Sequence, residues 1–140
     1  MSRISRRQKG ANVNSQNATL GEFIQQLLIQ IGPKTALHFK DERRWHELFY
    51  EMKTSPETPG KPRFLAKMFF DWNGEYPRSQ ELSSYLHSLH WTGCMAAANP
   101  GYDGFKLNSK VADLWRTEVA PDLANYIQNT AGQATPRLAA

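Results

Sequence analysis

The chain has 140 residues, 40% hydrophobic and 11% aromatic, which is enough to bury a core and argues against wholesale disorder. Its apolar runs fall short of the ~18–20 residues that cross a bilayer, and the single Cys94 excludes an internal disulfide framework. The formal net charge is +4. We therefore expect a cytoplasmic protein in a reducing compartment, with no membrane partner.

The net charge is concentrated at the N-terminus. Residues 1–18 contain no acid and four basic side chains, Arg3, Arg6, Arg7 and Lys9. The rest of the chain balances 13 basic with 13 acidic side chains. A short basic arm can neutralise nucleic-acid phosphates or meet an anionic membrane surface, although many terminal segments are simply solvated. We predict a disordered basic arm over residues 1–18, one domain over residues 19–130 and a frayed tail over residues 131–140.

The first predicted element is an amphipathic helix over Thr19–Ile31, where apolar residues recur at spacings of three and four. Thr19 and Glu22 match the capping box, in which each side chain satisfies a free backbone N–H of the other. Gly32 and Pro33 end this helix. Lys34–Lys40 fits either a turn or a short helical piece.

The middle of the chain alternates apolar and turn-forming segments. Asp41–Lys53 is predicted to be a second helix, with Asp41 as its N-cap. Thr54–Arg63 holds three prolines and a glycine, which indicates a loop. Phe64–Trp72 fits a helix or a buried strand, and we favour a helix because its apolar residues also recur at helical spacing. These residues are Leu65, Met68, Phe69 and Trp72.

The second half begins with a helix that Ser79 caps and Gly93 ends. Cys94–Ala98 and Gly104–Leu107 are predicted strands, joined by a turn over residues 99–103. Asn108 or Ser109 caps the last helix, and Pro121 kinks it or splits it in two. Its expected inner face consists of Val111, Leu114, Trp115 and Val119. The predicted fold is therefore mainly α, with one small β-hairpin as a minor β component.

The search for catalytic or metal-binding groups finds little. Cys94 and His90 could form a thiol–base pair, but Cys94 begins a strand expected to face the core, and no third residue orients the base. His87 and His90 are three apart on one helix, whereas zinc needs three or four protein ligands. We therefore expect no enzymatic activity, no cofactor, no metal and no small-molecule substrate.

The order helix, glycine stop, strand, turn, strand and capped helix resembles a winged-helix domain over residues 64–110. This resemblance implies DNA binding, with the helix at 79–91 in the major groove and the hairpin on the backbone. The residues expected to contact DNA are Arg3, Arg6, Arg7, Lys9, Arg78, Gln80, Ser83, Ser84, His87, Lys106 and Lys110. The helix itself has no lysine or arginine and carries Glu81. The basic arm would therefore supply most of the affinity.

A second hypothesis stays open beside DNA binding. A winged helix with a neutral surface can also dock another protein, form a homodimer or serve as an adaptor in a larger assembly. The anchors would then be the aromatic side chains of Trp91, Tyr102 and Trp115. The turn GEYPRS before the helix is similar to that of small bacterial, phage or plasmid-borne helical proteins. Other aromatic residues at helical spacing are more typical of a core than of a base-stacking platform.

Overall fold

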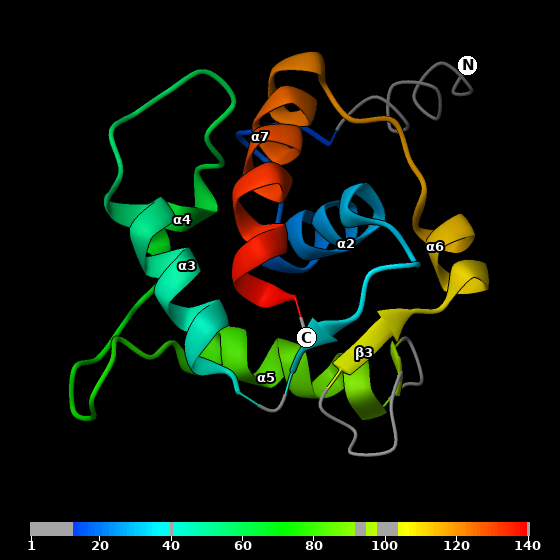
Figure 1. Cartoon of the computed structure of the whole chain (residues 1–140). Coiled ribbons are helices and arrows are strands. Elements are labelled where there is room, and N and C mark those ends of the chain that lie inside the picture. The colour runs from blue at the N-terminus through cyan, green and yellow to red at the C-terminus, as the bar shows by residue number, and fades with distance from the viewer. Residues whose placement is uncertain (1–12, 40, 92–94, 98–103, 140) are drawn as a thin grey trace.

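A computed structural model describes residues 13–39, 41–91, 95–97 and 104–139 (Figure 1). The described chain is mainly helical and carries a small antiparallel sheet. In chain order, its elements are α2 (Leu20–Ile31), β1 (Leu37–His38), α3 (Arg43–Thr54), α4 (Phe64–Lys67), α5 (Gln80–Trp91), β2 (Met95–Ala97), β3 (Gly104–Leu107), α6 (Ser109–Trp115) and α7 (Pro121–Leu138). The expected mainly α fold with a minor β component is confirmed.

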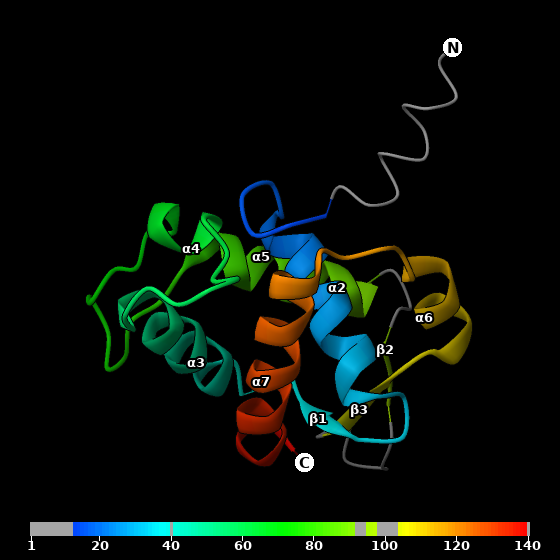
Figure 2. The same ribbon diagram turned by 90° about the horizontal axis from the view of Figure 1, so that it is seen from above.

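Helix α2 lies at the centre of the fold, and α7 packs along it (Figure 2). Its buried side chains form one stripe, Leu20, Phe23, Ile24, Leu27 and Leu28. The predicted capping box is present: the Thr19 hydroxyl accepts from the Glu22 N–H at 3.1 Å, and the Glu22 carboxylate accepts from the Thr19 N–H at 2.9 Å. Local sequence signals therefore determine both ends of this helix, because Gly32 follows it with a positive φ of 101°.

Strand β3 is the middle strand of the sheet, in the order β1-β3-β2. The hairpin partners β2 and β3 are antiparallel, as predicted, with Met95 opposite Leu107. Strand β1 was not expected, because Lys34–Lys40 was interpreted as a turn or a helical piece. Its pairing of Leu37 with Phe105 ties the hairpin to the first half of the chain. The predicted turn over residues 99–103, Gly93 and Cys94 lie outside the described residues.

The helix predicted over Phe64–Trp72 is wrong in its second half. Helix α4 ends at Lys67, and Met68 already has an extended backbone with ψ of 134°. In an extended segment the side chains alternate between two faces, so helical spacing no longer groups them. Leu65 and Met68 are buried, but Phe69 and Trp72 are 75% and 58% exposed.

The C-terminal half of the chain follows the predicted order of elements and differs in one buried position. Pro121 is the first residue of α7, so the second of the two predicted alternatives holds, and the last helix is split into α6 and α7. The side chain of Asn108 caps α6, as one of the two alternatives predicted. The expected inner position Leu114 is 82% exposed, and Ala112 is buried in its place.

The tail predicted to fray is instead part of the core. Helix α7 continues to Leu138, and the side chains of Ala134 and Leu138 are fully buried. Ala139 then forms a bridge with Leu37 of β1. The small residues of this tail predict fraying, but in the structure Ala131 and Ala134 are buried and let α7 pack closely against its neighbours.

We predict that Leu138→Ala lowers the free energy of unfolding by about 2–4 kcal/mol, because it removes a fully buried side chain. Gln133→Ala, at an exposed position on the same helix, is the control and is expected to change stability little. Chemical denaturation of both variants tests this. Equal stability of Leu138→Ala and the wild type would contradict the placement of the tail in the core.

Candidate functional site

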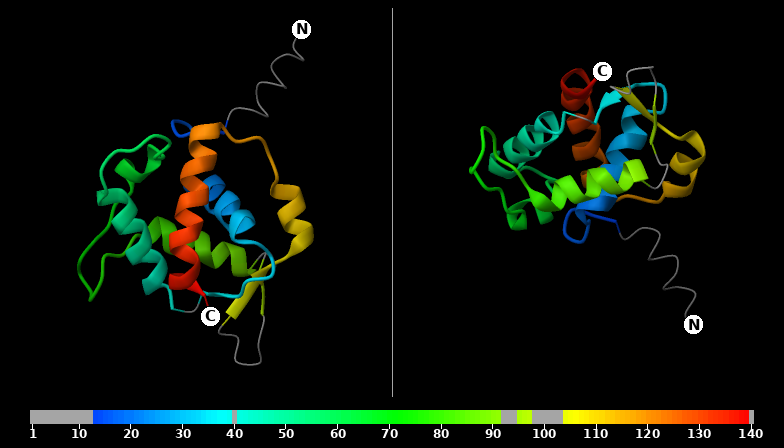
Figure 3. Two further views of the ribbon diagram at one scale, coloured as in Figure 1. Left: turned by 45° about the horizontal axis from the view of Figure 1, so that its top comes forward. Right: turned by 90° about the horizontal axis from the view of Figure 1, so that it is seen from below.

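The candidate site is the surface of α5, together with the polar contacts that fix this helix against α3. In the view from below, α5 crosses the molecule beside the hairpin (Figure 3). Ser79 caps the helix as predicted, because its hydroxyl accepts from the Leu82 N–H at 3.3 Å. Leu82, Leu86 and Leu89 are buried on the inner side. The outer side carries polar residues and so determines what this surface can bind.

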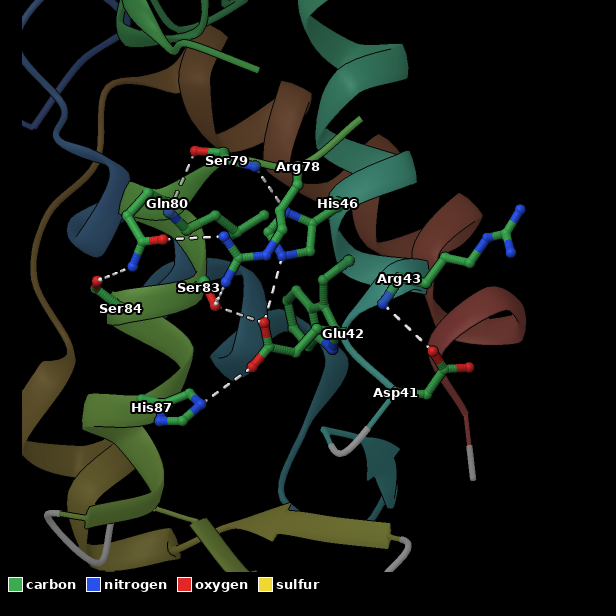
Figure 4. A network of polar contacts seen from close by, with 12 residues as sticks. Asp41, Glu42, Arg43, His46, Arg78, Ser79, Gln80, Ser83, Ser84 and His87 are labelled. Carbon is green, nitrogen blue, oxygen red and sulfur yellow. Dashed lines mark hydrogen bonds and ion pairs between the residues drawn. The ribbon is translucent and has the colours of Figure 1, made fainter. Parts of the chain in front are cut away.

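His46 of α3 joins the start of α5 to α3 (Figure 4). Its side chain is fully buried, and its Nδ1 accepts a hydrogen bond from the Ser79 backbone N–H at 3.1 Å. Since Nδ1 is an acceptor, the proton of the neutral ring is on Nε2, which faces the Glu42 carboxylate at 3.4 Å. Burial lowers the pKa of His46 below its ordinary value, against the opposing effect of Glu42. The neutral imidazole is therefore a structural connector between the two helices.

The Glu42 carboxylate makes polar contacts with side chains of α5 as well as with His46 of α3. The Ser83 hydroxyl donates to its Oε1 at 2.7 Å, and His87 Nε2 lies 3.3 Å from its Oε2. The same Ser83 hydroxyl accepts from Arg78 Nη2 at 3.1 Å. A carboxylate placed among these donors holds the first two turns of α5 in one orientation.

The structure brings together five of the residues expected to contact DNA, Arg78, Gln80, Ser83, Ser84 and His87 (Figure 4). Ser83 is wrongly placed by the sequence prediction. It was expected on the exposed face of the helix but is buried, and its hydroxyl is directed to Glu42. Arg78 is half-buried and donates to Gln80 Oε1 at 2.9 Å. These two residues organise the start of α5 from within.

Three of the five residues remain on the surface. Gln80 and Ser84 are exposed and lie one turn apart, with the Gln80 amide donating to the Ser84 hydroxyl at 3.3 Å. The side chain of His87 is 67% exposed even though it contacts Glu42. Amide and hydroxyl groups that hydrogen-bond each other on the exposed surface can exchange this bond for hydrogen bonds to a ligand. This surface therefore suits a ligand that presents both donors and acceptors.

Lys106 and Lys110 lie beyond the C-terminal end of α5. Both are exposed, on β3 and in the first turn of α6 respectively, and neither forms an ion pair within the residues that the structure describes. Their charges are therefore available to an anionic ligand. By contrast, Arg43 at the other end of the site forms ion pairs with Glu47 and Glu75, at 3.0 and 3.7 Å.

Among the remaining predicted residues, the structure describes the side chain of Trp115 alone. Arg3, Arg6, Arg7, Lys9 and Tyr102, together with the side chain of Trp91, lie outside the described residues. Trp115, expected as an exposed anchor, is half-buried against the core. Its carbonyl accepts from the Gln26 side chain at 2.9 Å. This burial agrees with the predicted place of Trp115 on the inner face of the last helix, and its role as a docking anchor stays a prediction.

The root of the predicted basic arm is anchored. The predicted disorder over residues 1–18 is wrong for its last part, because Val13 pairs with Val119 and Ala18 is buried. The Arg63 N–H also donates to the Ser15 carbonyl at 2.7 Å. The four basic residues of the arm precede this anchored segment in the chain.

Sequence reasoning missed Glu42 and His46. Their i,i+4 spacing within a predicted helix was visible, but their contacts with Ser79, Ser83 and His87 join segments more than thirty residues apart. Among the described residues, no group of three or more metal-ligating side chains is found. No helix in this part of the chain combines the length and apolar character needed to span a bilayer.

Comparison with known proteins identifies no relative. No family model, no curated protein and no solved structure matches the chain.

We predict that the pKa of His46 makes the protein less stable in mild acid. The unfolded chain takes up a proton near pH 6.5, before the folded state does. The free energy of unfolding therefore falls as the pH drops from about 6.5 toward the lowered pKa of the folded state. His46→Asn, which keeps an acceptor for the Ser79 N–H but does not titrate, should show a smaller fall.

The measurement is denaturant unfolding between about pH 7 and pH 5, with Gln133→Asn as the control. Gln133→Asn exchanges one neutral amide for another at an exposed position of α7, so the pH dependence of stability should stay like that of the wild type. Identical pH profiles for His46→Asn and the wild type would contradict the neutral, hydrogen-bonded state of His46.

Proposed function

We propose that this protein is a cytoplasmic, non-enzymatic DNA-binding module of the winged-helix type. The observation that carries the proposal is the exposed polar face of α5, followed directly by the antiparallel pair β2–β3. An α-helix fits the major groove of B-DNA, where amide and hydroxyl side chains can read base edges. In this arrangement Gln80, Ser84 and His87 face the groove.

Positive charge beside the hairpin supports the same orientation. Lys106 lies on β3, which pairs with the strand β2 that contacts α5, and Lys110 lies at the start of α6. We therefore expect a duplex bound along α5 to meet both lysines. Contacts of this kind position a protein on the phosphate backbone without reading sequence. Base recognition is then left to the surface of α5.

The acidic groups around α5 limit how much affinity the helix can supply. Glu81 is exposed in its first turn, and Glu42 lies beneath His87. Because phosphate neutralisation supplies most non-specific affinity, a nearly neutral helix needs cations from elsewhere. The arm with its four basic residues is one source, and its anchored root at Val13 gives it a fixed starting point.

A second candidate function is the docking of another protein, and the exposed aromatic residues after α4 favour it. Phe69 is 75% and Trp72 58% exposed, and Trp72 packs edge-on against Tyr50 with ring centroids 5.4 Å apart. Exposed aromatic side chains of this size are enriched at protein interfaces. This surface lies on a different segment from the residues proposed to contact DNA.

The two functions are distinguished by binding to mixed-sequence duplex DNA, followed by fluorescence anisotropy as salt is varied. We expect binding at low salt that weakens as salt rises, and removal of residues 1–12 should lower the slope of log K against log salt by up to about 3.6 for four phosphate contacts. Absence of binding at low salt, with self-association that Phe69→Ser abolishes, would favour docking instead.

A single charge tests the role of α5 itself. Ser84→Glu places an acid on the exposed face, so we expect a loss of DNA affinity by roughly ten-fold or more through repulsion of phosphate. Gln133→Glu adds the same charge at an exposed position of α7 and is the matched control. Equal affinities of the two variants would argue against contact between α5 and DNA.

A further inference from the structure

The side chains of two basic residues at α4 take no part in the site described above. Arg63 and Lys67 are exposed and four residues apart, and Arg63 has helical backbone angles directly before the helix. Neither forms an ion pair within the described residues, whereas Arg43, Arg44, Arg116 and Arg137 all do. Side chains at this spacing project from the same face of a helix, so the two positive charges act together.

Two hollows meet at this pair. A hollow of about 410 Å³ is bordered by Arg63 and Lys67 on one side, and by Thr19 and Glu81 on the other. A second hollow of about 220 Å³ shares Arg63 and Lys67 and extends to Lys53 and Lys61. The pair therefore stands on a ridge, and the first hollow links it to Glu81 at the start of the exposed face of α5.

The neighbouring lysines hold this ridge in place. Lys53 Nζ donates to the carbonyls of Leu65 and Ala66 at 3.2 and 2.9 Å, at the end of α4. Lys61 Nζ donates to the carbonyls of Lys53 and Ser55 at 3.2 and 2.6 Å, at the end of α3. Both ammonium groups are thus used by the fold, but their charges still add to the local positive potential.

Acidic groups close to the ridge are few. Glu57 lies 3.8 Å from Lys61 Nζ, and Glu81 borders the larger hollow. The nearby Glu22 carboxylate accepts the Thr19 N–H in the capping box. Among the described residues that line the two hollows, four are basic and two, Glu57 and Glu81, are acidic, which makes the α4 segment attractive to anions.

We propose that Arg63 and Lys67 bind backbone phosphates of the same nucleic acid that α5 contacts. The inference rests on the proposed function and adds to it a source of affinity within the folded chain. Continuity through the shared hollow favours a long polyanion over a small one, because one duplex can reach both α5 and the α4 ridge. Glu81, between the two, opposes this binding and reduces its strength.

The experiment measures affinity for a mixed-sequence DNA duplex by anisotropy between about 50 and 200 mM salt. Arg63→Gln and Lys67→Gln should each lower the slope of log K against log salt by about 0.9, and the double variant by about 1.8. At about 0.1 M salt, each substitution should weaken binding roughly eight-fold, as that slope implies. Both side chains are exposed and unpaired in the described structure, so thermal unfolding should stay unchanged and exclude misfolding as the cause.

Lys34→Gln is the matched control. Lys34 is exposed and forms no ion pair within the described part of the chain, but it follows the C-terminal end of α2, whereas the hollow lies at the N-terminal end. The twelve residues of α2 separate these ends by about 18 Å. A double variant with the same slope as Lys34→Gln would overturn the inference.

Three further outcomes are decisive. If the wild type binds DNA and the double variant keeps its slope, only the role of the ridge fails and the proposed function stands. Absence of wild-type binding at low salt would overturn both. Inorganic phosphate, added at matched ionic strength, could remove the difference in DNA affinity between the double variant and the wild type. In that case Arg63 and Lys67 bind free phosphate, and their assignment to nucleic acid is wrong.

Discussion

The buried imidazole of His46 is the contact on which the arrangement of the site depends. A helix begins with backbone N–H groups that lack intrahelical partners, and burying the start of α5 without acceptors would be costly. Ser79 supplies one acceptor through its hydroxyl, and His46 Nδ1 satisfies the Ser79 N–H itself. The Nε2 atom of the same ring faces the Glu42 carboxylate, which accepts a hydrogen bond from the Ser83 hydroxyl. One neutral ring therefore couples the orientation of α5 to that of α3.

This coupling has a consequence for recognition. The groups that hold α5 in place are drawn from the residues that would otherwise contact a ligand, so Ser83 and much of Arg78 are used internally. The part of α5 that remains exposed is a narrow strip of side chains with almost no net charge. In the proposed function, a helix of this kind would recognise shape and base edges, whereas the binding free energy would come from cations elsewhere. The structure provides such cations beside the hairpin and on the α4 ridge.

Local signals in the sequence predicted much of the fold. The capping box of Thr19 and Glu22, the Ser79 cap and the Asn108 cap act through neighbouring residues, and each is present. Features fixed by distant contacts were missed. The two-residue strand β1 exists because Leu37 meets Phe105, and the tail stays helical because Leu138 reaches the core. The burial of Ser83 likewise depends on Glu42, 41 residues away, which no periodicity on α5 could reveal.

The central claim is that the outer face of α5 contacts nucleic acid in the orientation that His46 and Glu42 fix. The most direct measurement is NMR mapping of backbone amide shifts as a short DNA duplex is added to the full chain. The account predicts the largest changes at Gln80, Ser84 and His87, with further changes at Lys106. Changes confined to residues 1–12 or to the Phe69–Trp72 segment, with those of α5 unmoved, would contradict it.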